Sequence, residues 1–191
     1  LTCAYRLKQE GINAAIYEAS SRVGGRCWTR RGDFEECQIV ERGGELIDTD
    51  HVEIRELSRE LGLVLDDLNE AEPDNTEPFY YFNGCPYTFE EATKDFLEIY
   101  PKLQEDLEAV GETTLYNHYT ERGYQLDHMS ILDYINELVP GGIRSRFGEL
   151  LAVAYTIEYG AEAYMQSALN LLYLLGYAPR GPLQIFGESD E

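Results

Sequence analysis

Apolar residues stand three or four positions apart along most of the second half of the chain, which is typical of helices that bury one face. The first such helix runs to Val110, and it begins at a capping box that Thr88 forms with Glu91. Pro101 is expected to kink or split this helix, because proline lacks the amide hydrogen that an α-helix needs. The region 111–127 is polar and lacks this spacing, so we expect an irregular connection there.

Three further helices are predicted on the same grounds. The first extends from the capping pair Ser130 and Asp133 to Val139. The apolar positions of the next two lie at 143–155 and 166–175. Because the last of these helices is apolar on every side, we expect it to be buried.

Two stretches show the pattern of strands joined by tight turns. Asn83 and Gly84 separate two aromatic runs and supply the two positive φ angles of a type I′ turn, so 79–87 is predicted to form a β-hairpin. Two shorter strands are expected at 27–31 and 36–40.

The beginning of the chain combines a helix with a short strand. Residues 1–7 carry apolar side chains at helical spacing, and Gly11 stands where a helix commonly ends. Residues 14–17 are small or apolar and are predicted to form a buried strand that ends at Glu18.

One more helix and strand precede a change in composition. Asp50 and Glu53 form a capping box for a helix that ends at Gly62, and a short apolar strand is expected at 63–65. The acidic stretch 66–77, with its prolines, is interpreted as the border between two domains.

Composition narrows the classes of function. The chain has 36 acidic and 15 basic residues and a formal net charge of −21. This charge repels nucleic acid and anionic membranes, so neither is expected as a partner. In the sequence, no apolar run approaches the ~20 residues of a membrane span. The cysteines and histidines are scattered without metal-ligand spacing, so no metal site is predicted.

Several residues of the first domain point to a bound nucleotide. In a dinucleotide-binding βαβ unit, an acid at the end of the second strand hydrogen-bonds the cofactor ribose, and Glu18 has this position. Glu18 alone fits an ordinary α/β unit equally well. The stretch that follows favours the nucleotide, because Gly24 and Gly25 let the backbone approach a phosphate and Arg26 offers a bidentate fork to its oxygens.

Two segments resemble a known family. Residues 18–26, Glu-Ala-Ser-Ser-Arg-Val-Gly-Gly-Arg, look like the second flavin fingerprint of the flavin-containing amine oxidase superfamily, which includes monoamine oxidases and L-amino-acid oxidases. Residues 41–47 resemble the next element of that family, a Gly-Gly turn that passes close to the flavin. The resemblance implies an α/β fold, with a partial FAD-binding Rossmann-like (two-dinucleotide-binding) domain at 1–66 and a largely helical α+β substrate-domain segment at 67–191.

The resemblance also implies FAD as the cofactor and a set of contacts to it. Glu18 would take the ribose hydroxyls, the first glycine pair would lie along the nucleotide, and the second near the isoalloxazine ring. The expected cofactor-binding residues are Glu18, Ala19, Arg22, Gly24, Gly25, Arg26, Gly43, Gly44, Glu45 and Leu46. A structural salt bridge explains Arg22 equally well, and Glu45 could simply cap the next element. The catalytic lysine and aromatic pair belong to later family segments, so no catalytic residue is assigned.

The same resemblance indicates that the chain is a piece of a larger enzyme. The Gly-rich phosphate loop stands roughly 20 residues before the ribose-binding acid, which would be upstream of Leu1. We therefore expect an N-terminal-half fragment that lacks the first Gly-rich loop and binds FAD weakly by itself. A homodimer of the full-length protein is a further expectation.

By resemblance, the reaction is the oxidation of a C–N bond by FAD, which yields an imine or aldehyde, ammonia and hydrogen peroxide. L-amino-acid oxidases of the superfamily usually carry an arginine three residues past the Gly-Gly turn, where it holds the substrate carboxylate. Here that position is Ile47, so a primary amine is favoured over an amino acid as the small-molecule substrate. An L-amino-acid oxidase and a catalytically incompetent truncated remnant stay open as alternatives.

Overall fold

The computed structural model describes residues 1–71, 73 and 76–186, and these form two compact units. The first unit contains residues 1–47 and 51–57, and the second contains the other described residues. Residues 72, 74 and 75 of the predicted border lie outside the described residues, as do 187–191. The domain border near Asp66 stays a prediction.

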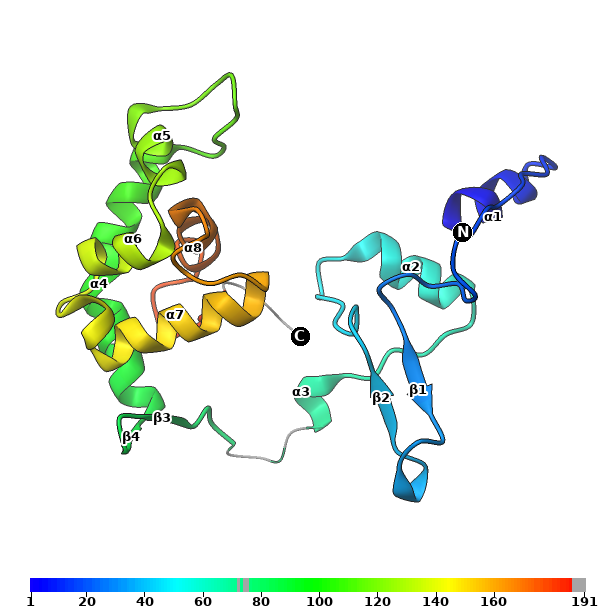
Figure 1. Ribbon diagram of the computed structural model, residues 1–191, viewed down its shortest axis with the longest axis horizontal. Helices are drawn as coiled ribbons and strands as arrows, with labels where there is room; N and C mark the ends of the chain where they lie inside the picture. Colours follow the sequence, from blue (N-terminus) through cyan, green and yellow to red (C-terminus); the bar gives the residue numbers. More distant parts are fainter. Residues whose placement is uncertain (72, 74–75, 187–191) are drawn as a thin grey trace. The chain divides into compact units, whose positions relative to one another are not determined.

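The first unit is built from one sheet and two helices. Its elements are α1 (Thr2–Gln9), β1 (Thr29–Arg31), β2 (Ile39–Glu41) and the first part of α2 (Val52–Glu60). The two strands lie side by side in Figure 1 and pair antiparallel, with Thr29 opposite Glu41 and Arg31 opposite Ile39. The strand pair predicted here is confirmed, with shorter strands than the sequence pattern suggested.

Two strands expected in this part of the chain are absent from it. Residues 14–17 form no strand, and Ile16 and Tyr17 are 56% and 93% exposed. Residues 63–65 form none either, and Val64 is exposed. A strand satisfies its backbone by pairing with a neighbour, and no described residue pairs with either stretch. The described residues contain helices and two small antiparallel sheets, so the Rossmann-like sheet stays a prediction.

The second unit is mainly helical. A long helix lies beside a group of shorter ones, and a hairpin stands at its beginning (Figure 1). The elements are α3 (Leu68–Ala71), β3 (Tyr80–Phe82), β4 (Cys85–Tyr87), α4 (Phe89–Val110), α5 (Glu121–Asp127), α6 (Ile131–Leu138), α7 (Arg146–Tyr159) and α8 (Ala168–Leu175). In the described part of the chain, no helix has both the length and the apolar character to span a membrane.

The hairpin forms as the sequence predicts. Asn83 and Gly84 have φ angles of 54° and 78°, as a type I′ turn requires. Tyr87 on β4 is fully buried in the core, so this aromatic side chain anchors the hairpin to the helices. The Asn83 amide also donates a hydrogen bond of 2.8 Å to Glu149 on α7.

The predicted capping box begins α4. The Thr88 hydroxyl accepts a hydrogen bond of 3.1 Å from the backbone amide of Glu91, whose carboxylate accepts one of 2.9 Å from the Thr88 amide. The helix continues for 22 residues through Pro101, so the proline does not split it, and the expected kink stays a prediction. Ile99 and Leu103 are buried on either side of the proline, and this packing holds the helix together.

The region 111–127 contains a helix that the sequence analysis missed. Thr120 caps α5, because its hydroxyl accepts a hydrogen bond of 3.0 Å from the Gly123 amide. Leu126 and Gly123 are the only residues of this seven-residue helix that are buried. So short a helix shows no apolar period, and the cap was the single signal available.

An ionic network around one buried carboxylate joins three helices. Asp106 on α4 is 2% exposed. Its carboxylate accepts hydrogen bonds from Lys102 (3.0 Å), from Arg122 on α5 (2.9 Å) and from Tyr134 on α6 (3.0 Å). Burial raises the pKa of the Asp106 carboxyl, but these three donors outweigh burial and hold the pKa below its usual range.

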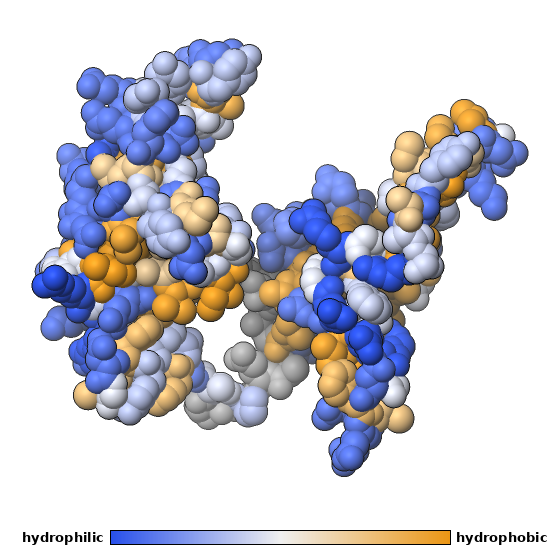
Figure 2. Space-filling view, viewed as in Figure 1, coloured by the Kyte–Doolittle hydropathy of each residue, from blue (hydrophilic) through white to orange (hydrophobic). Residues whose placement is uncertain are grey.

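Apolar side chains also reach the surface of this unit. On the face shown in Figure 2 they gather over α7, where Val153 and Ile157 are 49% and 73% exposed. The buried apolar residues, by contrast, all come from the hairpin, α4 to α8 and the segments between and after these helices.

We predict that Asp106→Asn lowers the free energy of unfolding by about 2–3 kcal/mol at pH 7, because three donors then lose a charged acceptor. The folded-state pKa of Asp106 lies below its unfolded value, so its contribution is complete above pH ~4 and declines as the pH falls further. Urea denaturation at several pH values measures the difference between wild type and variant, which should shrink in acid.

Glu105→Gln is the matched control for this prediction. Glu105 lies next to Asp106, is 73% exposed and forms an ion pair with Lys102, whose Nζ atom lies 3.5 Å from its carboxylate. Its substitution should change the free energy of unfolding by less than about 0.5 kcal/mol. Equal effects of the two substitutions would contradict the role given to Asp106.

Candidate functional site

The two glycine turns of the first unit lie directly against each other. A Cβ atom on Gly43 would stand 2.6 Å from the carbonyl oxygen of Arg26, and one on Gly44 would stand 2.5 Å from the Cys27 sulfur. Both glycines also have positive φ angles, of 74° and 56°. A side chain at Gly43 would collide with backbone, so this close approach requires glycine.

Arg22 holds the first of these turns in shape. Its guanidinium donates hydrogen bonds to the carbonyl oxygens of Val23 (3.2 Å), Gly25 (2.5 Å) and Cys27 (3.1 Å). These three bonds use the planar fork of the guanidinium to close the loop around it. The geometry therefore gives Arg22 a structural role in the loop, while its contact to the cofactor stays a prediction.

Trp28 joins the two turns. The guanidinium carbon of Arg22 lies 4.7 Å from the centroid of the Trp28 ring, and that of Arg42 lies 4.6 Å from it. The backbone amide of Arg42 also donates a hydrogen bond of 2.9 Å to the Trp28 carbonyl. Arg30 lies 5.3 Å from the same ring. Three arginines thus share one indole, at distances where cation–π attraction is effective.

This role of Trp28 was not foreseen from the sequence. Arg22 and Arg42 stand six positions before and fourteen after the tryptophan, and no helical or strand period connects such positions. Only the folded turn brings them to one ring.

Glu18 occupies an exposed turn just before these residues. One of its carboxylate oxygens accepts a hydrogen bond of 2.8 Å from the Ser20 amide. This bond is the main reason why the pKa of Glu18 lies below its usual range. The side chain is therefore ionised at neutral pH and acts as a hydrogen-bond acceptor, which is what a ribose hydroxyl requires.

The remaining candidate residues are exposed. Arg26 makes no hydrogen bond or ion pair with any described residue, so its guanidinium is available to an anion. A Cβ at Gly25 would meet nothing within 4 Å, so the backbone is open there. The other candidates in this group, which are also solvent-exposed or line the turns, are Ala19, Gly24, Glu45 and Leu46.

These properties fit a dinucleotide cofactor. The segment offers an ionised acceptor for a hydroxyl, an unengaged arginine for a phosphate and an open backbone between them. The arginines around Trp28 add positive charge locally to a chain whose net charge is −21. Such a local positive field attracts a pyrophosphate.

Comparison with known proteins shows which family the chain belongs to. Residues 1–171 match the model of the family described as flavin containing amine oxidoreductase. The chain belongs to this family. FAD is accordingly the cofactor, as the resemblance implied, and the family's members are oxidoreductases.

Several curated proteins match parts of the chain. Amine oxidase [flavin-containing] B of Sus scrofa is 34% identical over 89 residues, which are 47% of this chain and 16% of that protein. The L-amino-acid oxidase of Naja atra is 36% identical over 95 residues, covering 50% of this chain and 18% of that protein. Nicotine dehydrogenase of Pseudomonas putida is 28% identical over 149 residues, 72% of this chain and 28% of its own length. No solved structure matches the chain.

The matched parts of the chain thus span less than a fifth of the length of the first two relatives. The match nevertheless includes both glycine turns, since the family model covers residues 1–171. The candidate residues of this subsection therefore lie within the matched region.

The two arginines of the first turn should respond differently to substitution by lysine. We predict that Arg22→Lys lowers the free energy of unfolding of the first unit by about 1 kcal/mol, because lysine cannot reproduce the fork that closes the loop. Arg26→Lys should change it by less than about 0.5 kcal/mol. Trp28 is the single tryptophan, so its fluorescence during urea denaturation measures this unit alone.

The amount of FAD that the full-length protein retains is a second measurement for the Arg26→Lys variant. In the full-length protein, Arg26→Lys should still weaken FAD binding, because lysine lacks the bidentate geometry of arginine. A common midpoint of denaturation for both variants would refute the assignment of Arg22 as the residue that shapes the loop.

Proposed function

We propose that the chain is part of an FAD-dependent oxidase that acts on a primary amine. The reaction would oxidise the C–N single bond to an imine with FAD as the electron acceptor, and water would hydrolyse the imine to an aldehyde and ammonia. Dioxygen would then take up the two electrons and two protons, which gives hydrogen peroxide. The observation that supports this most strongly is the pair of glycine turns, packed together beside an unengaged Arg26, in a chain of the flavin containing amine oxidoreductase family.

Bound FAD supplies the two-electron oxidation, and the residues of this chain hold and orient it. We assign to Glu18 the binding of the ribose hydroxyls, because its ionised carboxylate can accept hydrogen bonds from them. Arg26 and the backbone of Gly25 would face the pyrophosphate, where the arginine fork and the open backbone suit the anion.

The second turn would pass near the flavin ring. Gly43 and Gly44 keep the backbone of this turn close to Arg26 and Cys27, so the turn and the loop that would face the phosphate form one continuous surface. Glu45 and Leu46 follow the turn and are exposed, which makes their side chains available to the ring or to the substrate. No catalytic residue is assigned within this chain.

The choice of substrate depends on the residues after the second turn. A substrate carboxylate needs a basic partner, and Leu46 and Ile47 carry no charge. The sequence neighbours Glu45 and Asp48 are acidic, so they would repel a carboxylate and favour an ammonium group. Relatives named as amine oxidases and as L-amino-acid oxidases both match the chain, and this local chemistry is what favours the amine.

An L-amino-acid oxidase is the second candidate. It is favoured by the match to the Naja atra protein, whose identity of 36% is similar to that of the amine oxidase. In that case a basic group from elsewhere in the full-length protein would hold the substrate carboxylate.

Peroxide release from the full-length protein separates these candidates. We predict turnover of tyramine or putrescine and at least tenfold lower kcat/KM for phenylalanine, leucine, glutamate and lysine. The difference arises because residues 45–48, which follow the second glycine turn, include no arginine that could hold a carboxylate. Turnover of the amino acids without the amines would overturn the amine assignment in favour of the second candidate.

If the full-length protein turns over none of these substrates, its FAD content decides between two explanations. Protein that retains FAD but releases no peroxide would refute the oxidase activity, whereas protein without FAD would support a catalytically incompetent remnant. Glu18→Ala serves as the internal reference, because it should lower FAD retention about tenfold while Glu105→Ala leaves it unchanged.

A further inference from the structure

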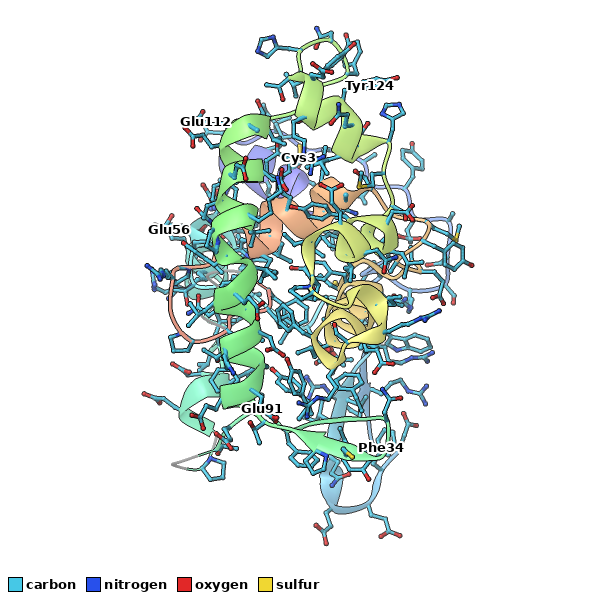
Figure 3. All side chains as sticks on the ribbon, turned by 90° about the vertical axis from the view of Figure 1, so that its left-hand side faces the viewer. Cys3, Phe34, Glu56, Glu91, Glu112 and Tyr124 are labelled. Atoms are coloured by element: carbon cyan, nitrogen blue, oxygen red, sulfur yellow. The ribbon has the colours of Figure 1, made fainter. Side chains whose placement is uncertain are left out.

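A pocket of about 400 Å³ lies on the second unit, between α5 and the segment that precedes it. This volume is within the range of small-molecule sites. Its lining includes Thr114, Tyr116, Tyr119, Tyr124, Asp127 and His128. Figure 3 shows Tyr124 on α5, near the end of α4 that leads to Glu112.

The segment before α5 is held in a defined shape. The backbones of Leu115 and His118 exchange two hydrogen bonds, of 2.8 and 3.2 Å, which close a tight turn. The Thr114 hydroxyl lies 3.1 Å from that of Tyr173 on α8, so the segment is also fixed to the helical core. The pocket is therefore formed before any ligand binds.

Aromatic side chains make up much of the pocket wall. The rings of Tyr119 and Tyr124 are tilted at 37° with centroids 5.4 Å apart, and His128 stacks on Tyr124 at 4.1 Å. Tyr119 and Tyr124 are 51% and 49% exposed, so about half of each side chain remains accessible. Aromatic rings attract cations that lie over their faces within about 6 Å of the ring centre.

Asp127 gives the pocket its charge. One oxygen of its carboxylate accepts a hydrogen bond of 3.3 Å from Ser167, and the side chain stays 51% exposed. The Nδ1 atom of His128 donates to the Tyr124 carbonyl at 2.9 Å and lies 3.8 Å from the Asp127 carboxylate. The lining contains no lysine or arginine.

We infer that this pocket binds a small organic cation of the alkylammonium class. The tyrosine rings would surround the ammonium group, and the Asp127 carboxylate would neutralise it. The strongly negative net charge of the chain raises the local concentration of such cations. This site lies wholly within the helical unit and does not depend on the proposed oxidase function.

Choline and its uncharged isostere 3,3-dimethyl-1-butanol provide the direct test, because they differ in charge and hardly in shape. We expect isothermal titration of the 191-residue chain to give about tenfold weaker binding for the alcohol. Raising the salt concentration to about 1 M should weaken choline binding, because the charge of Asp127 is then screened. Equal affinity for the two compounds would overturn the inference, as would no binding of choline.

Substitutions of residues that line the pocket test whether choline binds there. Tyr124→Phe keeps the aromatic ring and should bind choline with an affinity within about twofold of wild type. Tyr124→Leu should lower the affinity for choline about fivefold or more. Asp127→Asn should lower the affinity for choline by a similar factor and should make choline binding less dependent on the salt concentration. Tyr164→Leu is the control, because Tyr164 is 63% exposed and lies outside this pocket. Wild-type affinity in both Tyr124→Leu and Asp127→Asn would refute the site, and the same titration of the full-length protein shows whether it persists there.

Discussion

The close contact between the two glycine turns is the constraint on which the first unit depends. Because the Arg26 carbonyl leaves no space for a side chain at Gly43, the turn can lie against the loop only through bare backbone. That proximity brings Arg42 to the ring of Trp28, which Arg22 already contacts from the other turn. The loop that would face the cofactor is therefore shaped by the chain itself, before the cofactor binds.

The two units are stabilised in different ways. The large buried apolar residues of the described structure all lie between Tyr87 and Leu183. In residues 1–57, apolar side chains such as Ile16 and Tyr17 stay exposed, and hydrogen bonds, glycine packing and cation–π contacts supply the order. The second unit thus has a helical core of its own, whereas the first unit relies on local contacts, which a bound nucleotide would extend.

Elements could be predicted from the sequence where the residues that form them are close together in the chain. The hairpin at Asn83 and the helix capped by Thr88 were predicted correctly, because their signals lie within a few residues. The strand at 14–17 was wrong, because a strand depends on a partner that its own sequence does not specify. At the candidate site, the motif identified the glycines and the cofactor class, but the stacking of Arg42 on Trp28 joins positions without any common period.

The most direct test compares FAD content in two glycine variants of the full-length protein. Gly43 and Gly32 have similar positive φ angles, of 74° and 78°, so alanine strains the backbone equally at both. Only at Gly43 would the new Cβ meet backbone, since nothing lies within 4 Å at Gly32. Flavin absorbance of the purified proteins should show that Gly43→Ala loses most of its FAD while Gly32→Ala retains it. Equal FAD content in the two variants would contradict the account.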